Sequence, residues 1–280
     1  MRKIKRILIL GSLFALLFYS RLVNISWGFP YPMHPDERNM AWALMRLNPQ
    51  TYFKPDFFAY GQLPLYLGYI FVKVYHLLFN KIGFPISFIE ATIALRIISA
   101  TASVINAFLL LKIISLLNLK LKIKNFPQIT NNKLLITSLI IILSPFFIQF
   151  SHFGTTESLL MLCYSLIVYL TLLLVTKKII LSKYYFLVSC ICGLAIACKI
   201  SSVIFIIVPL ITIIQEVENL GRKFINAVKF ILLTLLISVV FSPYNYISFN
   251  EFLGSIRYES DVALGRYIVF YTDSLLVLSL

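Results

Sequence analysis

The stretch that decides the fold is residues 91–117, ATIALRIISATASVINAFLLLKIISLL. Only Arg96 and Lys112 interrupt this apolar run with a charge. A helix that crosses a bilayer needs about 20 mostly apolar residues, and this run is longer than that. We therefore expect a membrane-spanning helix here.

Further apolar runs on either side extend this interpretation to the whole chain. The 280 residues are 60% hydrophobic and 13% charged, whereas soluble domains are about 25% charged. The sequence therefore predicts one all-α, polytopic membrane domain over residues 1–280, with about seven transmembrane helices. Besides 91–117, the strong runs are Ile7–Tyr19, Leu134–Phe150, Leu159–Val175, Tyr184–Ala197, Ser201–Ile214 and Phe230–Ser242. The chain ends in a last apolar run, residues 274–280, which suggests that it is a piece of a longer protein.

The basic residues indicate how the chain is oriented. The net charge is +14, but the lysines and arginines lie in short loops between apolar runs, as the positive-inside rule predicts. This distribution argues against nucleic-acid binding and puts the N-terminus in the cytoplasm. The clusters are Arg2–Arg6, Lys112–Lys133, Lys177–Lys183 and Arg222–Lys229.

Two segments need special treatment for this orientation to hold. The weaker run Leu63–Phe79 must not cross, and its stripe of Lys73, His76 and Asn80 is typical of a helix lying in the interface; a true span with a polar stripe is the alternative. The stretch Tyr184–Ile214 is too long for one span, and Lys199 lies in its middle, so we expect two spans that meet near Lys199. Four segments then gather at the outer face. They are Asn24–Asn80, Ser151–Ser158, Lys199–Ser202 and Pro243–Asp273.

The first outer segment contains adjacent acids, Asp36 and Glu37. Carboxylates beside a membrane are costly, and two like charges this close push their pKa values apart, which suits proton transfer or cation binding. The alternative is structural, with Asp36 capping a helix that begins there. His34 and Asp36 together are a candidate metal pair, so a divalent cation is one reading of the site, although no cofactor is required by the sequence.

Five short motifs occur in chain order and resemble those of the GT-C membrane glycosyltransferases, most closely the protein O-mannosyltransferases and the aminoarabinose transferase of lipid A. The departure from the family pattern is Glu157, where the family usually has Asp. The motifs are His34–Glu37 (HPDE), Tyr60–Leu67 (YGQLPLYL), Leu95–Ala100 (LRIISA), Ser151–Leu160 (SHFGTTESLL) and Gly193–Lys199 (GLAIACK).

The resemblance implies a reaction and residues for it. A sugar would move from a polyprenyl-phosphate donor to a hydroxyl of a protein, lipid or glycan acceptor, with inversion. Asp36 would be the general base, Glu37 would orient the acceptor or a cation, and Lys199 would bind the donor phosphate. The remaining candidates for substrate binding are Arg38, Arg96, His152, Glu157, Arg257 and Tyr258.

Simpler interpretations remain for several of these residues. Arg96 would then reach up to the interface, and His152 would pack against Glu157. Two rival functions also remain, a non-catalytic or truncated family member and a membrane transporter. The lysine, isoleucine and asparagine content suggests a prokaryote, which would place the chain in the plasma membrane with its site on the outer face.

Overall fold

The fold is described by a computed structural model, which places residues 2–31, 34–120, 131–217 and 219–266. The residues that it describes form helices and connecting loops and no strand. The helices are α1 (Arg2–Leu22), α2 (Pro35–Arg46), η1 (Pro49–Thr51), α3 (Leu63–Leu78), α4 (Phe88–Lys120), α5 (Asn131–Leu143), α6 (Pro145–Ser151), α7 (Glu157–Val175), α8 (Leu181–Cys198), η2 (Ile200–Ile206), α9 (Ile207–Glu216), α10 (Leu220–Phe241), α11 (Tyr244–Ile247) and α12 (Phe249–Ala263).

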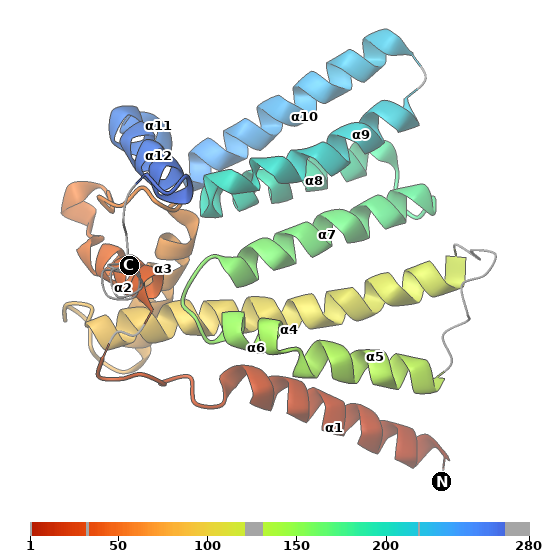
Figure 1. Cartoon of the computed structure of the whole chain (residues 1–280), viewed down its shortest axis with the longest axis horizontal. Coiled ribbons are helices and arrows are strands. Elements are labelled where there is room, and N and C mark those ends of the chain that lie inside the picture. The colour runs from red at the N-terminus through yellow and green to blue at the C-terminus, as the bar shows by residue number, and fades with distance from the viewer. Residues whose placement is uncertain (1, 32–33, 121–130, 218, 267–280) are drawn as a thin grey trace, which may run out of the picture.

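The long helices form a bundle, and Figure 1 shows them running in the same general direction. Within the described residues, α4, α7, α8 and α10 are long and apolar enough to cross a membrane, and the bent pair α5–α6 makes a fifth candidate. The chain is therefore a multi-pass membrane protein. Helix α1 and the η2–α9 segment are shorter in their apolar, described parts, so the count of seven spans stays a prediction.

Helix α4 lies at the centre of one half of the bundle and contacts α1, α2, α3, α5, α6 and α7. Its 33 residues make it about 50 Å long. Buried alanines, among them Ala94, Ala100 and Ala107, allow neighbouring helices to approach closely, which is how helices pack in lipid. Arg96 lies on this helix, near the end that meets the loops.

The run Leu134–Phe150 is not the single straight span that the sequence predicts. It is divided into α5 and α6, which are bent by 45°. Pro145 at the start of α6 has no N–H to continue the α5 ladder, and the buried guanidinium of Arg21 donates to the freed carbonyls of Ile141 (3.1 Å) and Ile142 (2.9 Å). Arg21 thus stabilises the break.

Helices α2, α3, α11 and α12 gather at one end of the long helices, here called the loop end (Figure 1). The expected interfacial helix is α3, and of its polar stripe Asn80 is exposed and Lys73 half-buried, whereas His76 is buried. His76 is 2% exposed and its Nε2 is 3.2 Å from Oε1 of Glu90, while Leu77 and Leu78 are exposed. The contact between His76 and Glu90 holds this face of α3 against α4, and it gives the buried imidazole a partner at Nε2.

The opposite end of the bundle carries the N-terminal end of α1 and the α7–α8 and α9–α10 connections (Figure 1). Lys177, Lys178 and Arg222 lie in or beside these two connections, as the positive-inside rule requires if this end is cytoplasmic. The predicted basic loop at 121–130 and the apolar run at 274–280 lie outside the described residues.

Candidate active site

The four segments predicted to meet at one face do so at the loop end. The N–H of Gly154 donates to Oε1 of Glu37 at 2.7 Å. Nζ of Lys199 is 3.5 Å from Oε1 of Glu157. Gln62 donates from Nε2 to Oδ1 of Asn245 at 2.7 Å. Residues from the first loop, the α6–α7 turn, the α8–η2 turn and the start of α11 therefore share one site region.

The two acids at the start of α2 face different surroundings. Asp36 is exposed and Glu37 is 2% exposed, because successive side chains on a helix point about 100° apart. The helix cap is not Asp36, as the structural alternative held, but His34, whose Nδ1 accepts the N–H of Glu37 at 3.4 Å. The carboxylate of Asp36 is therefore not used as the helix cap, and it interacts with the Tyr60 hydroxyl.

Glu37 and Arg96 form a buried ion pair. Nε of Arg96 donates to Oε1 at 2.7 Å and Nη2 donates to Oε2 at 2.6 Å, the two-pronged geometry that makes such pairs strong. Nη1 of Arg96 donates to the carbonyls of Ile25 and Trp27. Arg96 is 2% exposed, so it does not extend to the interface. Both groups hold the first loop against α4.

His152 also holds this loop in place, and it does not pack against Glu157 as the alternative proposed. Its ring nitrogens lie 2.8 Å from the carbonyl oxygens of Ile148 and Val23. Its own carbonyl accepts the indole N–H of Trp27 at 3.0 Å. The contacts of His152 are with these backbone groups and with the Ser151 hydroxyl, 3.2 Å from Nδ1, which makes it a residue that positions the loop.

Tyr60 links the two charged parts of the site, and the sequence reading missed it. Nζ of Lys199 lies 4.8 Å from the centre of the Tyr60 ring, within the range of a cation–π interaction. Burial raises the pKa of Tyr60, and the nearby charges of Asp36, Glu157 and Glu259 raise it further. Asp36, Tyr60, Lys199 and Glu157 are therefore neighbours, and this group is called the tyrosine cluster below.

Gly61 fixes Tyr60 in this position. Its N–H donates to the carbonyl of Cys198 at 2.9 Å, at the end of α8. A Cβ at residue 61 would lie 2.0 Å from the carbonyl oxygen of Ala197, so only glycine allows this approach. Two of the sequence motifs contain Gly61 and Lys199. The hydrogen bond between Gly61 and Cys198 brings these two motifs together in the fold.

A cavity of about 300 Å³ opens beside the tyrosine cluster. Ser255, Glu259 and Ser260 of α12 face Tyr60 and Lys199 across it. Arg257 and Tyr258, the α12 residues chosen from the sequence, are exposed and do not line this cavity. Arg38 is likewise exposed, on α2.

A second cavity, of about 310 Å³, lies on the other side of Glu157. Its remaining lining is apolar and comes from α6, α7 and η2. These lining residues are Phe146, Leu160, Met161, Tyr164 and Phe205. Glu157 thus lies between an apolar groove lined by helices and the tyrosine cluster.

The candidate metal pair does not gain further ligands. No group of three His, Cys, Asp or Glu side chains suited to a metal occurs among the residues that the structure places. His34 already uses Nδ1 in the helix cap, and its ring packs against Phe153 with the ring centres 4.4 Å apart. The geometry thus gives the divalent cation no support.

Comparison with known proteins identifies the family. The model of the dolichyl-phosphate-mannose-protein mannosyltransferase family matches residues 86–247. This range contains Arg96, His152, Glu157 and Lys199, and it does not include Asp36 and Glu37. No curated protein and no solved structure matches the chain. The match covers more than half of the chain and includes three of the five motifs, LRIISA, SHFGTTESLL and GLAIACK. The chain therefore belongs to the dolichyl-phosphate-mannose-protein mannosyltransferase family, a family of GT-C membrane glycosyltransferases.

Proposed function

We propose that this chain transfers a hexose, in the first instance mannose, from a polyprenyl-phosphate donor to an acceptor hydroxyl at the outer face of the plasma membrane. The observation that carries the proposal is the position of the tyrosine cluster. A carboxylate, a phenol and an ammonium group meet beside an apolar groove. A lipid-linked sugar needs such a combination, because its tail is apolar and its reacting end is anionic.

The donor would lie with its prenyl tail along the groove formed by α6, α7 and η2. Its phosphate would then come close to Lys199, whose side chain is 32% exposed. A cation at this point stabilises the phosphate as it takes up negative charge on leaving. Glu157 holds the ammonium group in the free protein and would have to share it when the phosphate arrives.

Asp36 is the proposed general base. The acceptor hydroxyl loses its proton to the Asp36 carboxylate as its oxygen attacks the anomeric carbon. The bond from that carbon to the phosphate oxygen breaks, and the electron pair leaves with the lipid phosphate. A base must lie within hydrogen-bond reach of the attacking hydroxyl, and the exposed carboxylate of Asp36 is accessible to an acceptor from the aqueous side.

Glu37 takes a different part from the one that the motif alone suggests. Both of its oxygens are engaged by Arg96, and Oε1 also accepts from Gly154. We infer that Glu37 positions the start of α2, and hence Asp36, instead of contacting the acceptor. Arg96 acts through Glu37 in the same way.

The membrane topology follows from the same proposal. If α1 and the η2–α9 segment cross together with the five candidates, the residues that the structure describes make seven crossings, and the loop end lies outside when the N-terminus is cytoplasmic. Cysteine labelling tests this arrangement. A cysteine at exposed Asn39 should react with a membrane-impermeant maleimide in intact cells, and one at exposed Lys178 should react only after lysis.

The activity is tested with purified protein in liposomes and a donor of defined chemistry. Radiolabelled polyprenyl-phosphate mannose should lose its sugar to an added membrane extract, whereas GDP-mannose should not serve. The Lys199→Met variant should require a higher donor concentration. If GDP-mannose alone supports transfer, or if Lys199→Met uses the lipid donor as well as the wild type does, the proposed donor site is wrong.

A further inference from the structure

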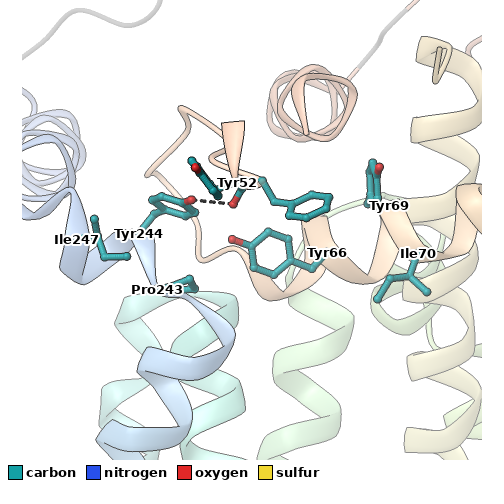
Figure 2. A pocket seen from close by; sticks show the side chains of 8 residues that line it. Tyr52, Tyr66, Tyr69, Ile70, Pro243, Tyr244 and Ile247 are labelled. Atoms are coloured by element: carbon teal, nitrogen blue, oxygen red, sulfur yellow. Dashed lines mark hydrogen bonds between the residues drawn. The ribbon is translucent and has the colours of Figure 1, made fainter. Parts of the chain in front are cut away.

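A separate aromatic pocket lies at the loop end, between α3, α11 and the loop that follows α2. Its volume is about 410 Å³, which is within the usual size of small-molecule sites. Figure 2 shows the side chains converging on this space from three parts of the chain. Five of its lining residues are aromatic. They are Tyr52, Phe53, Tyr66, Tyr69 and Tyr244.

The loop that forms one wall adopts an unfavourable backbone conformation. Tyr52 and Phe53 have φ angles of 50° and 61°, a left-handed region that large side chains rarely adopt. The loop is held by a bond from the Tyr244 hydroxyl to the carbonyl of Tyr52 at 2.7 Å and by one from the Phe53 N–H to Asn48 at 2.9 Å. Such strain tends to be kept where it shapes a functional site.

One polar group in the pocket is available to a ligand. Among the described residues, none accepts or donates a hydrogen bond at the Tyr66 hydroxyl, and Figure 2 shows this hydroxyl directed toward the Tyr244 side. Burial raises the pKa of Tyr66, with a smaller contribution from Tyr244. The phenol is therefore a hydrogen-bond donor at neutral pH.

Gln62 connects one wall of the pocket to the segment that carries Tyr60. The N–H of Tyr244 donates to Oε1 of Gln62 at 3.1 Å, and the backbone N–H of Gln62 donates to Ser242 at 3.1 Å. Gln62 is two residues after Tyr60, so their Cα atoms are at most about 7 Å apart. A molecule in the pocket would thus contact Tyr244, which Gln62 joins to the segment that carries Tyr60.

We propose that this pocket binds a sugar ring of the acceptor, so that the enzyme extends a glycan. This proposal rests on the proposed function. Pyranose rings present flat C–H faces that pack on aromatic rings, whose faces are negative, and hydroxyls at their edges that a phenol can serve. The pocket lies beyond the end of α10 in Figure 2, where a water-borne glycan would reach it and a prenyl chain would have to leave the hydrocarbon.

Binding can be measured without turnover. The protein would be placed in nanodiscs, which avoid sugar-based detergents, and mixed with mannotriose, chitotriose or farnesol. Saturation-transfer NMR should show contact with a trisaccharide. The Tyr66→Ala variant should bind it about threefold to tenfold more weakly, as expected for the loss of one stacked ring. Tyr66→Phe keeps the ring and should lose less.

Controls separate the pocket from the active site and from general damage. Tyr31 is 71% exposed and outside the pocket, so Tyr31→Ala should bind like the wild type. Asp36→Asn should also bind normally while losing transfer, which distinguishes a failure of this proposal from a failure of the proposed function. Absence of trisaccharide binding, equal binding by Tyr66→Ala, or binding of farnesol in its place would each overturn the assignment.

Discussion

Glu37 and Arg96, 59 residues apart in the sequence, form a two-pronged ion pair that is almost completely buried. The pair joins the start of α2 to α4 and also receives the N–H of Gly154. One contact point thus fixes three segments of the site region. Removal of either partner leaves a buried charge without compensation.

Arg96→Met should therefore destabilise the protein strongly. Loss of one member of a buried pair costs about 3–5 kcal/mol, which corresponds to a fall of about 10 °C in melting temperature. Thermal unfolding in detergent measures this. Replacing both members, Glu37→Leu with Arg96→Met, should recover much of the stability but not the transfer activity. Arg38→Met, at an exposed neighbour, is the matched control, and an equal effect there would contradict the interpretation.

Gly61→Ala should abolish transfer while the amount of protein in the membrane stays close to that of the wild type. Its Cβ would lie 2.0 Å from the carbonyl oxygen of Ala197, so the backbone must move and take Tyr60 away from Lys199. Gly254 has open space at its Cβ position, and Gly254→Ala should keep normal activity. Transfer rates of the two variants at equal amounts in the membrane decide the matter, and an active Gly61→Ala protein would mean that this contact is not needed.

Tyr60→Phe should lower the rate of transfer about tenfold while leaving the affinity for the donor unchanged. The variant keeps the ring under Lys199 and loses the hydroxyl beside Asp36. A free tyrosine has a pKa of about 10. Burial and the Asp36 charge raise the pKa of Tyr60 above that value, so the phenol stays protonated near neutral pH. The pH dependence of transfer should then keep its shape in Tyr60→Phe. A lost alkaline limb would instead identify Tyr60 as an ionising catalytic group.

Glu157→Gln should tighten the binding of donor. The change releases Lys199 from its 3.5 Å contact with the carboxylate and removes a negative charge from the path of the phosphate. We expect the opposite from Lys199→Met, with donor affinity weakened about tenfold or more, since a hydrogen bond to a charged group contributes about 1.5–3 kcal/mol. Donor titrations of both variants test this pair, and a parallel loss in the two would show that Glu157 itself binds substrate.

Much of this arrangement could be predicted from sequence, because hydropathy and loop charge limit where a membrane helix begins and ends. The division at Lys199 is an example that the structure confirms: α8 ends at Cys198 and η2 begins at Ile200. The break before Pro145 was missed, although proline at that point is a recognisable signal. The burial of His76 was also missed, because its partner Glu90 lies on another helix.

The sequence predicts candidate residues for the site, and their geometry comes from the fold. The pair Asp36-Glu37 gave no indication that one acid would be exposed and the other buried, since this depends on where α2 begins and on Arg96. Tyr60 is the first residue of the YGQLPLYL motif, but nothing in the motif distinguishes it from its neighbours. Its importance comes from the Gly61 contact with α8, a long-range approach that no local pattern reveals.

The most direct test of the central claim is sugar transfer by Asp36→Asn. Asparagine keeps the shape of the side chain and cannot accept the proton. Asp56→Asn is the matched control, because Asp56 is an exposed acid in the same segment, between α1 and α3, that pairs with Lys54 instead. With radiolabelled polyprenyl-phosphate mannose, we predict that transfer is lost in Asp36→Asn and normal in Asp56→Asn. Equal transfer by Asp36→Asn and the wild type would contradict the account, because Asp36 would then not be the base.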